Sequence, residues 1–145
     1  MIINKMMLKL PALSINEAFA RSVVAAFILP LDPTMQELAD VKTAVSEAVT
    51  NAIIHGYGDC EGFIFINAQL TRDGIFEIEI EDSGVGISDL PLALSPMYTS
   101  APELERSGMG FTIMEQFMDS LVVDSKPGAG TKVRMVKKLQ PRNLH

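Results

Sequence analysis

Glu47, Asn51 and His55, three side chains that could take part in catalysis or ligand binding, lie four residues apart in the first half of the chain. On a helix this spacing places them along one face, which drifts slowly around the axis. A carboxylate can act as a base, an amide oxygen can ligate a metal ion, and an imidazole can donate a hydrogen bond. No Lys or Arg lies between Lys42 and Arg72, so the trio is not part of an ordinary salt-bridged surface. A solvated helix face also carries polar residues, so the trio alone does not define a site.

Three glycine-rich corners follow along the chain, at residues 82–86 (DSGVG), 107–110 (SGMG) and 128–131 (GAGT). Glycine lets the backbone approach a ligand closely, and a helix N-terminus offers free N–H groups to an anion. Each corner taken singly is equally typical of a turn. The sequence contains no glycine-rich loop ending in Gly-Lys-Ser or Gly-Lys-Thr, which excludes a P-loop, and neither of the first two corners completes a dinucleotide-binding motif.

Two helices are expected before the first of these corners. Ser14 and Glu17 have the spacing of a capping box, so the first helix is expected to begin there and to run to about residue 29. Asp32-Pro33 is typical of an N-cap followed by proline at the first helical position, so the second helix is expected over about 33–55. Apolar residues recur along this second helix with the 3.6-residue period of a buried stripe. They are Leu38, Val41, Val45, Ala48, Val49 and Ala52.

Strands are predicted where apolar and polar residues alternate, and glycine-containing turns join them into hairpins. The predicted strands cover residues 5–10, 63–70, 75–81, 121–124 and 131–138, and a third helix is expected from about Gly110. Residues 83–108 are expected to form a long irregular segment, which in a small domain is usually functional. This order favours one α+β domain over residues 1–145, a two-layer sandwich with helices on one face of a mixed or antiparallel sheet.

Composition bounds the function. The 145 residues include twelve basic and eighteen acidic side chains, a net charge of −6, so we expect no direct contact with nucleic acid. The single cysteine, Cys60, excludes an intrachain disulfide and a cysteine-based zinc site. The sequence shows no signal-peptide pattern and no apolar run near the ~18 residues of a membrane span. A cytoplasmic protein with no membrane partner is therefore expected.

The order of these motifs is more specific than any one of them. A helix face from Glu47 to His55 followed by the corners at 82–86, 107–110 and 128–131 resembles the N, G1, G2 and G3 motifs of the Bergerat-type ATP-binding fold shared by gyrase, the ninety-kilodalton heat-shock chaperone, histidine kinases and MutL. The runs SEAVTNAIIHGY, EDSGVGI and ERSGMGFTIMEQFMD are similar to the anti-sigma serine kinases of spore-forming bacteria. No histidine precedes Glu47, where a histidine kinase carries its phosphoacceptor, so that class is the poorer match.

The resemblance implies a site for ATP or ADP with Mg²⁺. In it Asn51 is the magnesium ligand and Glu47 is the general base that deprotonates the acceptor serine. Asp82 accepts a hydrogen bond from the exocyclic amine of adenine, and Thr131 supports the same edge of the base. Arg106, at the end of an ATP lid over about 88–107, reaches the γ-phosphate, although it could instead pair with a neighbouring glutamate. The other implied nucleotide contacts are His55, Gly84, Gly86, Ser107, Gly108, Met109, Gly110 and Phe111.

The resemblance also implies partners. It predicts a serine protein kinase that inhibits a sporulation sigma factor, phosphorylates a small anti-anti-sigma protein and works as a homodimer, with Arg21 as a partner contact. Arg21 could equally be an ordinary exposed helix residue. The apolar residues Met6, Leu8, Leu10, Ile15, Phe19, Val23, Val24 and Phe27 could form the dimer interface or simply pack on the sheet. Two alternatives stay open: a general-stress-type anti-sigma kinase, and a non-catalytic switch that sequesters its partner when ATP binds.

Overall fold

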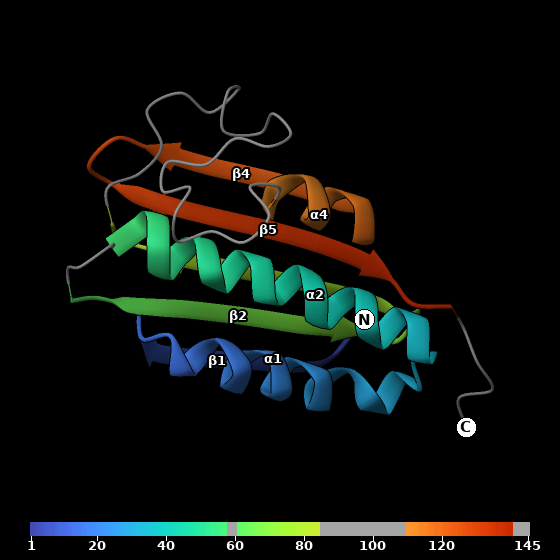
Figure 1. Cartoon of the computed structure of the whole chain (residues 1–145). Helices are drawn as coiled ribbons and strands as arrows, with labels where there is room; N and C mark the ends of the chain where they lie inside the picture. The colour runs from blue at the N-terminus through green and yellow to red at the C-terminus, as the bar shows by residue number, and fades with distance from the viewer. Residues whose placement is uncertain (58–60, 85–109, 141–145) are drawn as a thin grey trace.

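A computed structural model describes residues 1–57, 61–84 and 110–140 of the chain. These residues form two layers, a five-stranded sheet with the helices on one face (Figure 1). The strands are β1 (Ile2–Pro11), β2 (Phe63–Thr71), β3 (Ile75–Asp82), β4 (Ser120–Lys126) and β5 (Gly130–Lys138). They lie in the order β1-β2-β3-β5-β4, and each neighbouring pair is antiparallel. The predicted α+β sandwich is confirmed, with an antiparallel rather than a mixed arrangement of the described strands.

The helical layer consists of α1 (Ile15–Ile28), α2 (Met35–Asn51) and α4 (Gly110–Phe117). A short 3-10 turn, η1 (Leu29–Leu31), follows α1, and a π-helical turn, η2 (Ala52–Tyr57), extends α2. Helix α2 lies between α1 and α4 and packs against both of them (Figure 1). The second predicted helix therefore exists, but from Ala52 onward it has the wider π-helical winding, which continues to Tyr57.

The cap that begins each of the first two helices differs from the sequence prediction. Ser14 has helical dihedral angles and makes no side-chain capping hydrogen bond. The capping box belongs to Thr34 and Glu37: the Glu37 N–H donates to Thr34 Oγ1 at 2.9 Å, and the Thr34 N–H donates to Glu37 Oε1 at 2.8 Å. Asp32 is not an N-cap, because its φ of 50° ends η1 in the left-handed region. Helix α2 consequently starts at Met35, two residues later than predicted.

The predicted apolar stripe of α2 faces the sheet. Val41, Val45, Ala48, Val49 and Ala52 are buried, and Leu38 packs against them at the edge of the core. Beneath them lies a layer of buried residues from the three inner strands: Ile64, Ile66, Ala68, Leu70, Phe76, Ile78, Ile80, Val133 and Met135. Burial of each such aliphatic or aromatic side chain contributes roughly 1.5–3 kcal/mol, so this contact fixes α2 on the sheet.

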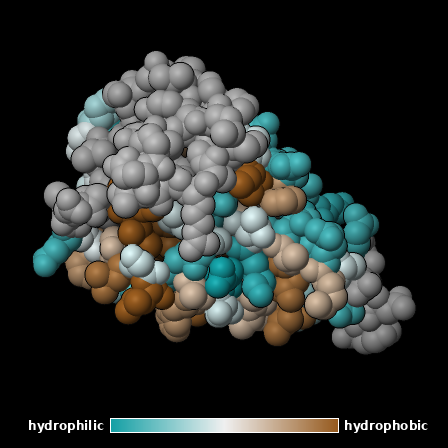
Figure 2. Space-filling model, viewed as in Figure 1, coloured by the Kyte–Doolittle hydropathy of each residue, from teal (hydrophilic) through white to brown (hydrophobic). Residues whose placement is uncertain are grey.

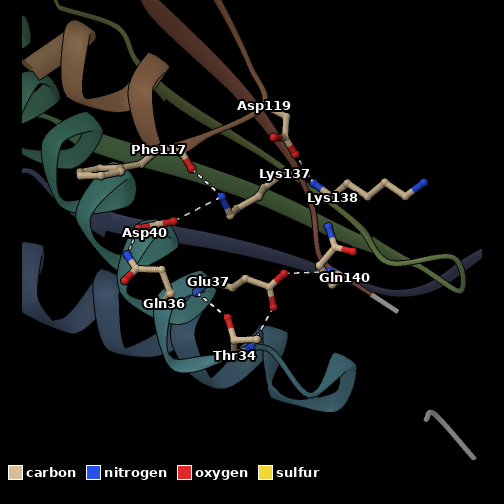
Figure 3. Close-up of polar contacts among 9 residues, drawn as sticks. All are labelled: Thr34, Gln36, Glu37, Asp40, Phe117, Asp119, Lys137, Lys138 and Gln140. Atoms are coloured by element: carbon tan, nitrogen blue, oxygen red, sulfur yellow. Dashed lines mark hydrogen bonds and ion pairs between the residues drawn. The ribbon is translucent and has the colours of Figure 1, made fainter. Parts of the chain in front are cut away.

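A polar cluster, which we call the clasp, ties α2, α4 and β5 together at one end of the molecule (Figure 3). Lys137 Nζ on β5 donates to the carbonyl oxygen of Phe117 at 2.7 Å and lies 3.6 Å from Asp40 Oδ2 on α2. The N–H of Lys138 donates to Asp119 Oδ2 at 2.6 Å. Because Phe117 is the last residue of α4, the clasp holds the C-terminal end of that helix.

The capping box at the start of α2 belongs to the same end of the fold. Glu37 also accepts a hydrogen bond from the N–H of Gln140 at 2.7 Å (Figure 3). Burial raises the pKa of Glu37, but the backbone N–H groups of Gln140 and Thr34, the Thr34 side chain and the charge of Lys137 together lower it below its ordinary value. The carboxylate of Glu37 therefore joins the chain after β5 to the first turn of α2.

Candidate functional site

Three polar residues form one row across the helix-covered face of the sheet. Asp82 on β3 is the register partner of Thr131 on β5, and Thr131 is also the register partner of Ser125 on β4. Each is in phase with the residues of its strand that are buried or packed against the core, so all three side chains face the helical layer. The antiparallel register thus brings together Asp82 and Thr131, the two residues predicted to contact adenine, and adds Ser125 beside them.

Asp82 is a buried carboxylate, with 5% of the residue exposed. Its Oδ1 accepts a hydrogen bond from the N–H of Gly84 at 2.9 Å, and the nearby backbone N–H of Thr131 also favours the charged carboxylate. Burial raises the pKa of Asp82 above its ordinary value, while these two donors partly offset that effect. A carboxylate has about four lone-pair directions, so the group can accept further hydrogen bonds from a ligand.

The two described glycines of the third corner have different structural roles. Gly130 has a φ of +87°, and a Cβ there would lie 2.1 Å from the backbone oxygen of Asp82. Gly128 has a φ of +79°, but a Cβ there would meet no atom within 4 Å. Gly128 therefore serves only the turn between β4 and β5, whereas Gly130 lets β5 approach the end of β3 and holds Thr131 next to Asp82.

Glu47 and Asn51 lie one helical turn apart at the C-terminal end of α2, and both are half-buried. The η2 turn that follows contacts β3 and β5, so this end of α2 lies over the Asp82 end of the sheet (Figure 1). His55 belongs to η2. The predicted base and metal ligand are thus carried to the same end of the fold as the predicted adenine contacts.

The residues present fit magnesium held through a nucleotide. No group of three or more His, Cys, Asp or Glu side chains that could hold a metal exists within residues 1–57, 61–84 and 110–140. Magnesium keeps several waters and usually takes one or two protein oxygens together with phosphate oxygens. A single amide oxygen, that of Asn51, beside a carboxylate satisfies this requirement and would not hold a metal strongly on its own.

Helix α4 begins at Gly110, which is buried, and Phe111 packs partly against the core. Met114, in the middle of α4, and Met118, immediately after it, are buried, and the clasp fixes the C-terminal end of the helix to α2 and β5. The N-terminal end of α4 is the predicted phosphate-binding end. The other predicted contacts, Gly86, Arg106, Ser107, Gly108 and Met109, and the lid over about 88–107 lie outside the described residues.

Arg21, the predicted partner contact, is on α1 and is partly exposed. Its Nη1 lies 3.2 Å from Glu17 Oε1, and the same carboxylate accepts a hydrogen bond from the hydroxyl of Ser46 on α2. Glu17 therefore links α1 to α2 instead of capping α1. Ser46 immediately precedes Glu47 in the chain, so Glu17 links the predicted partner residue Arg21 to the turn of α2 that carries the predicted base.

The apolar residues predicted for a dimer interface divide into two sets. Leu10 and Val24 are buried, and Met6, Leu8 and Phe27 pack partly against the core. Ile15 and Phe19 on α1 remain exposed, at 76% and 50%. Figure 2 shows apolar side chains gathered along the lower edge of that view, where α1 lies. Val23 is half-buried, so a partner on this face would meet chiefly Ile15 and Phe19.

Sequence reasoning missed two polar features. Ser125 follows Leu121 and Val123 at two-residue spacing on β4, and this period-2 pattern could have placed it on the same face as those two residues. The clasp had no local signal, since Asp40 and Lys137 are far apart in the chain and meet only through the packing of α2 on β5.

Comparison with known proteins gives consistent results. Residues 10–137 match the family model described as the histidine kinase-like ATPase domain. The anti-sigma F factor of Clostridium botulinum (strain Alaska E43 / Type E3) is 60% identical over 136 residues, which cover 93% of this chain and 94% of that protein. The anti-sigma F factor of Bacillus subtilis (strain 168) is 57% identical over 137 residues, with 94% and 93% covered.

Solved structures share the fold at much lower identity. The crystal structure of RsbU and RsbW domains of a Mycobacterium tuberculosis protein matches with a TM-score of 0.69 and 20% identity, over 96% of this chain and 34% of that one. A histidine kinase domain from the blue-light activated histidine kinase of Erythrobacter litoralis matches with a TM-score of 0.56 and 20% identity, over 85% and 61%. Within the described part of the chain, no helix is long and apolar enough to span a membrane.

Proposed function

We propose that this chain, which belongs to the anti-sigma F factor family and contains a histidine kinase-like ATPase domain, inhibits a sporulation sigma factor (sigma F) and acts as a magnesium- and ATP-dependent serine protein kinase on its small anti-anti-sigma antagonist. One observation carries the chemical part of the proposal. The pair formed by buried Asp82 and half-buried Thr131 lies at the same end of the fold as Glu47 and Asn51 on α2. Base recognition and phosphate chemistry therefore have their side chains within one site.

At the adenine end, Asp82 accepts a hydrogen bond from the exocyclic amine of the base. The carboxylate is already oriented by the N–H groups of Gly84 and Thr131, so it needs no rearrangement when the ligand arrives. Gly84 and Gly86 let the base lie against the backbone. An acceptor at this position selects adenine over guanine, which presents a carbonyl oxygen there instead of an amine.

At the phosphate end, Glu47 takes the proton of the acceptor serine hydroxyl, and Asn51 holds magnesium through its amide oxygen. Magnesium, when bound, neutralises charge that develops on the transferring phosphoryl group. The N–H groups at the start of α4, from Gly108 to Phe111, receive the phosphate oxygens. Arg106, at the end of the lid, contacts the γ-phosphate, where a guanidinium makes paired hydrogen bonds.

The partner side of the proposal is a homodimer with an α1 face that meets the sigma factor. Exposed Ile15 and Phe19 support it as an apolar contact surface, and Arg21 adds a partly exposed cation next to it. The location is cytoplasmic, where sigma factors and ATP are found. The identity of 56–61% to anti-sigma F factors supports a sporulation partner over a general-stress one.

Transfer of labelled γ-phosphate from ATP to the anti-anti-sigma protein of the same organism tests the proposal. The assay contains magnesium, and binding of the sigma factor is measured in parallel. Label on a serine of the antagonist, together with capture of the sigma factor, supports both activities. Capture of the sigma factor and binding of ATP without any label would replace the kinase with the non-catalytic sequestering switch.

A further inference from the structure

The hydroxyl of Ser125 lies at the outer end of the row that contains Asp82 and Thr131, and none of the proposed roles uses it. Its Oγ is 3.1 Å from the carbonyl oxygen of Gly130 and 2.8 Å from Oγ1 of Thr131. Both separations are within hydrogen-bond range. Ser125 is half-buried on β4, an edge strand of the sheet, so its hydroxyl has a fixed setting on the helix-covered face.

The number of hydroxyl protons decides the direction of these two hydrogen bonds. A carbonyl oxygen can only accept, so the contact with Gly130 uses the single hydroxyl proton of Ser125. The contact with Thr131 is compatible with either oxygen as the donor; with the Ser125 proton on Gly130, Ser125 is the acceptor and the Thr131 hydroxyl is the donor. Because β5 lies between β3 and β4, this assignment directs the Thr131 proton toward β4 and leaves its lone pairs on the side of Asp82.

We infer that Ser125 is a specificity-determining positioning residue, which fixes the Thr131 hydroxyl as a hydrogen-bond acceptor toward the purine base. The inference rests on the proposed function, because it takes the nucleotide base to lie against Asp82. Two acceptors, the Asp82 carboxylate and the Thr131 hydroxyl, then face the same edge of the base. The 6-amino group of adenine is a donor and can pair with them, whereas the 6-oxo group of inosine or guanine is an acceptor and cannot.

Binding of ATP and inosine triphosphate, each with magnesium, tests this role in the full chain. The two nucleotides differ at position 6 and in the proton on N1. Ser125→Ala removes the acceptor, so the Thr131 hydroxyl can turn and donate to the 6-oxo group. We expect the preference for ATP over inosine triphosphate to fall by about fivefold to tenfold, the order of one hydrogen bond.

Two single variants serve as controls for this measurement. Ser125→Thr keeps a hydroxyl and should keep the nucleotide preference. Ser120→Ala removes a serine from the same strand, but Ser120 is exposed and out of phase with Ser125, so the preference should not change. Thermal unfolding of each variant without nucleotide establishes that it is folded.

A double variant separates positioning from bracing of the β4–β5 turn. In a Thr131→Val background there is no hydroxyl to orient, so adding Ser125→Ala should leave the nucleotide preference unchanged. If Ser125→Ala alone weakens ATP and inosine triphosphate by the same factor, Ser125 merely braces the turn and the inference is overturned. Failure of the unmodified chain to bind ATP would instead remove the proposed function, which is a distinguishable result.

Discussion

Asp82 is the register partner of Thr131 across the β3–β5 pair, and the backbone N–H of Thr131 partly offsets the rise that burial causes in the pKa of Asp82. This pair joins the last residue of β3 to the second residue of β5, at the point where Gly130 allows the two strands to approach. The proposed recognition group is therefore part of the sheet itself. Its position depends on strand register and on one glycine, and does not require a flexible loop to deliver it.

The raised pKa of Asp82 predicts a pH dependence of stability in the chain without nucleotide. Between the ordinary value of 3.8 and the higher pKa of the folded state, the folded chain keeps a proton that the unfolded chain has lost. Stability from this group therefore falls as the pH rises through that interval. Thermal unfolding of the parent and Asp82→Asn from pH 4 upward measures it: the Tm of the parent minus that of the variant should decrease.

Asp73 is a control for the direction of this pH dependence of stability. The side-chain hydroxyl of Thr71 lowers its pKa below the ordinary value, so any contribution of Asp73 is lost as the pH falls. The Tm difference between the parent and Asp73→Asn should not decrease as the pH rises. A Tm difference for Asp82→Asn that is flat or increases with pH would contradict the buried setting of Asp82.

Gly130→Ala should destabilise the protein more than Gly128→Ala. Both glycines have positive φ, which costs an alanine roughly 1–2 kcal/mol. Only at Gly130 would the new Cβ also meet the backbone of Asp82, and such overpacking adds about 1–3 kcal/mol. Urea unfolding of the two variants gives the difference. Equal losses would mean that the close approach of β5 to β3 is not rigid.

Lys137→Met should lower the free energy of unfolding by about 1–3 kcal/mol, because it leaves Asp40 without its cation and the carbonyl of Phe117 without its donor. The side chains of Lys137 and Asp40 are 12% and 17% exposed, so water replaces these contacts poorly. Lys138→Met removes an exposed neighbour and should change stability by less than about 0.5 kcal/mol. Similar losses in the two variants would show that the clasp contributes nothing specific.

Thr34→Ala should destabilise the protein by about 0.5–2 kcal/mol, since it removes the hydroxyl that accepts from the N–H of Glu37. Ser14→Ala should have almost no effect, because Ser14 makes no side-chain cap. Denaturant unfolding of the pair compares the two candidate helix starts directly. A larger loss for Ser14→Ala would restore the capping box predicted from the sequence.

The elements with strong local patterns were predictable. The 3.6-residue stripe of α2 is buried, and both predicted hairpins are present because alternation and turn residues are local signals. The Asp82–Thr131 pair could be anticipated from the order of the motifs, which reflects a shared fold and not a local rule. Neither the alternation of residues nor the order of the motifs indicated that Asp82 and Thr131 are register partners on adjacent strands.

What the sequence did not reveal depends on contacts between distant residues. Two segments, at Ser14 before α1 and at Thr34 before α2, have the spacing of a capping box, and packing determines which of them forms one. Glu17 of the first segment accepts a hydrogen bond from Ser46 of α2 instead. The role of Ser125 depends on strand register, and the clasp depends on how α2 lies across β5. Contacts between residues so far apart in the chain cannot be predicted from local residue spacing.

In the proposed mechanism, Glu47 acts on the phosphate chemistry and not on nucleotide binding. We would measure phosphate transfer to the anti-anti-sigma protein and the Kd of ATP in the same samples of the parent, Glu47→Gln and the exposed control Glu115→Gln. Loss of a general base predicts transfer slowed by about 100-fold or more in Glu47→Gln, with the Kd of ATP within about threefold of the parent. Glu115→Gln should behave as the parent. Transfer at the parental rate by Glu47→Gln would contradict the account.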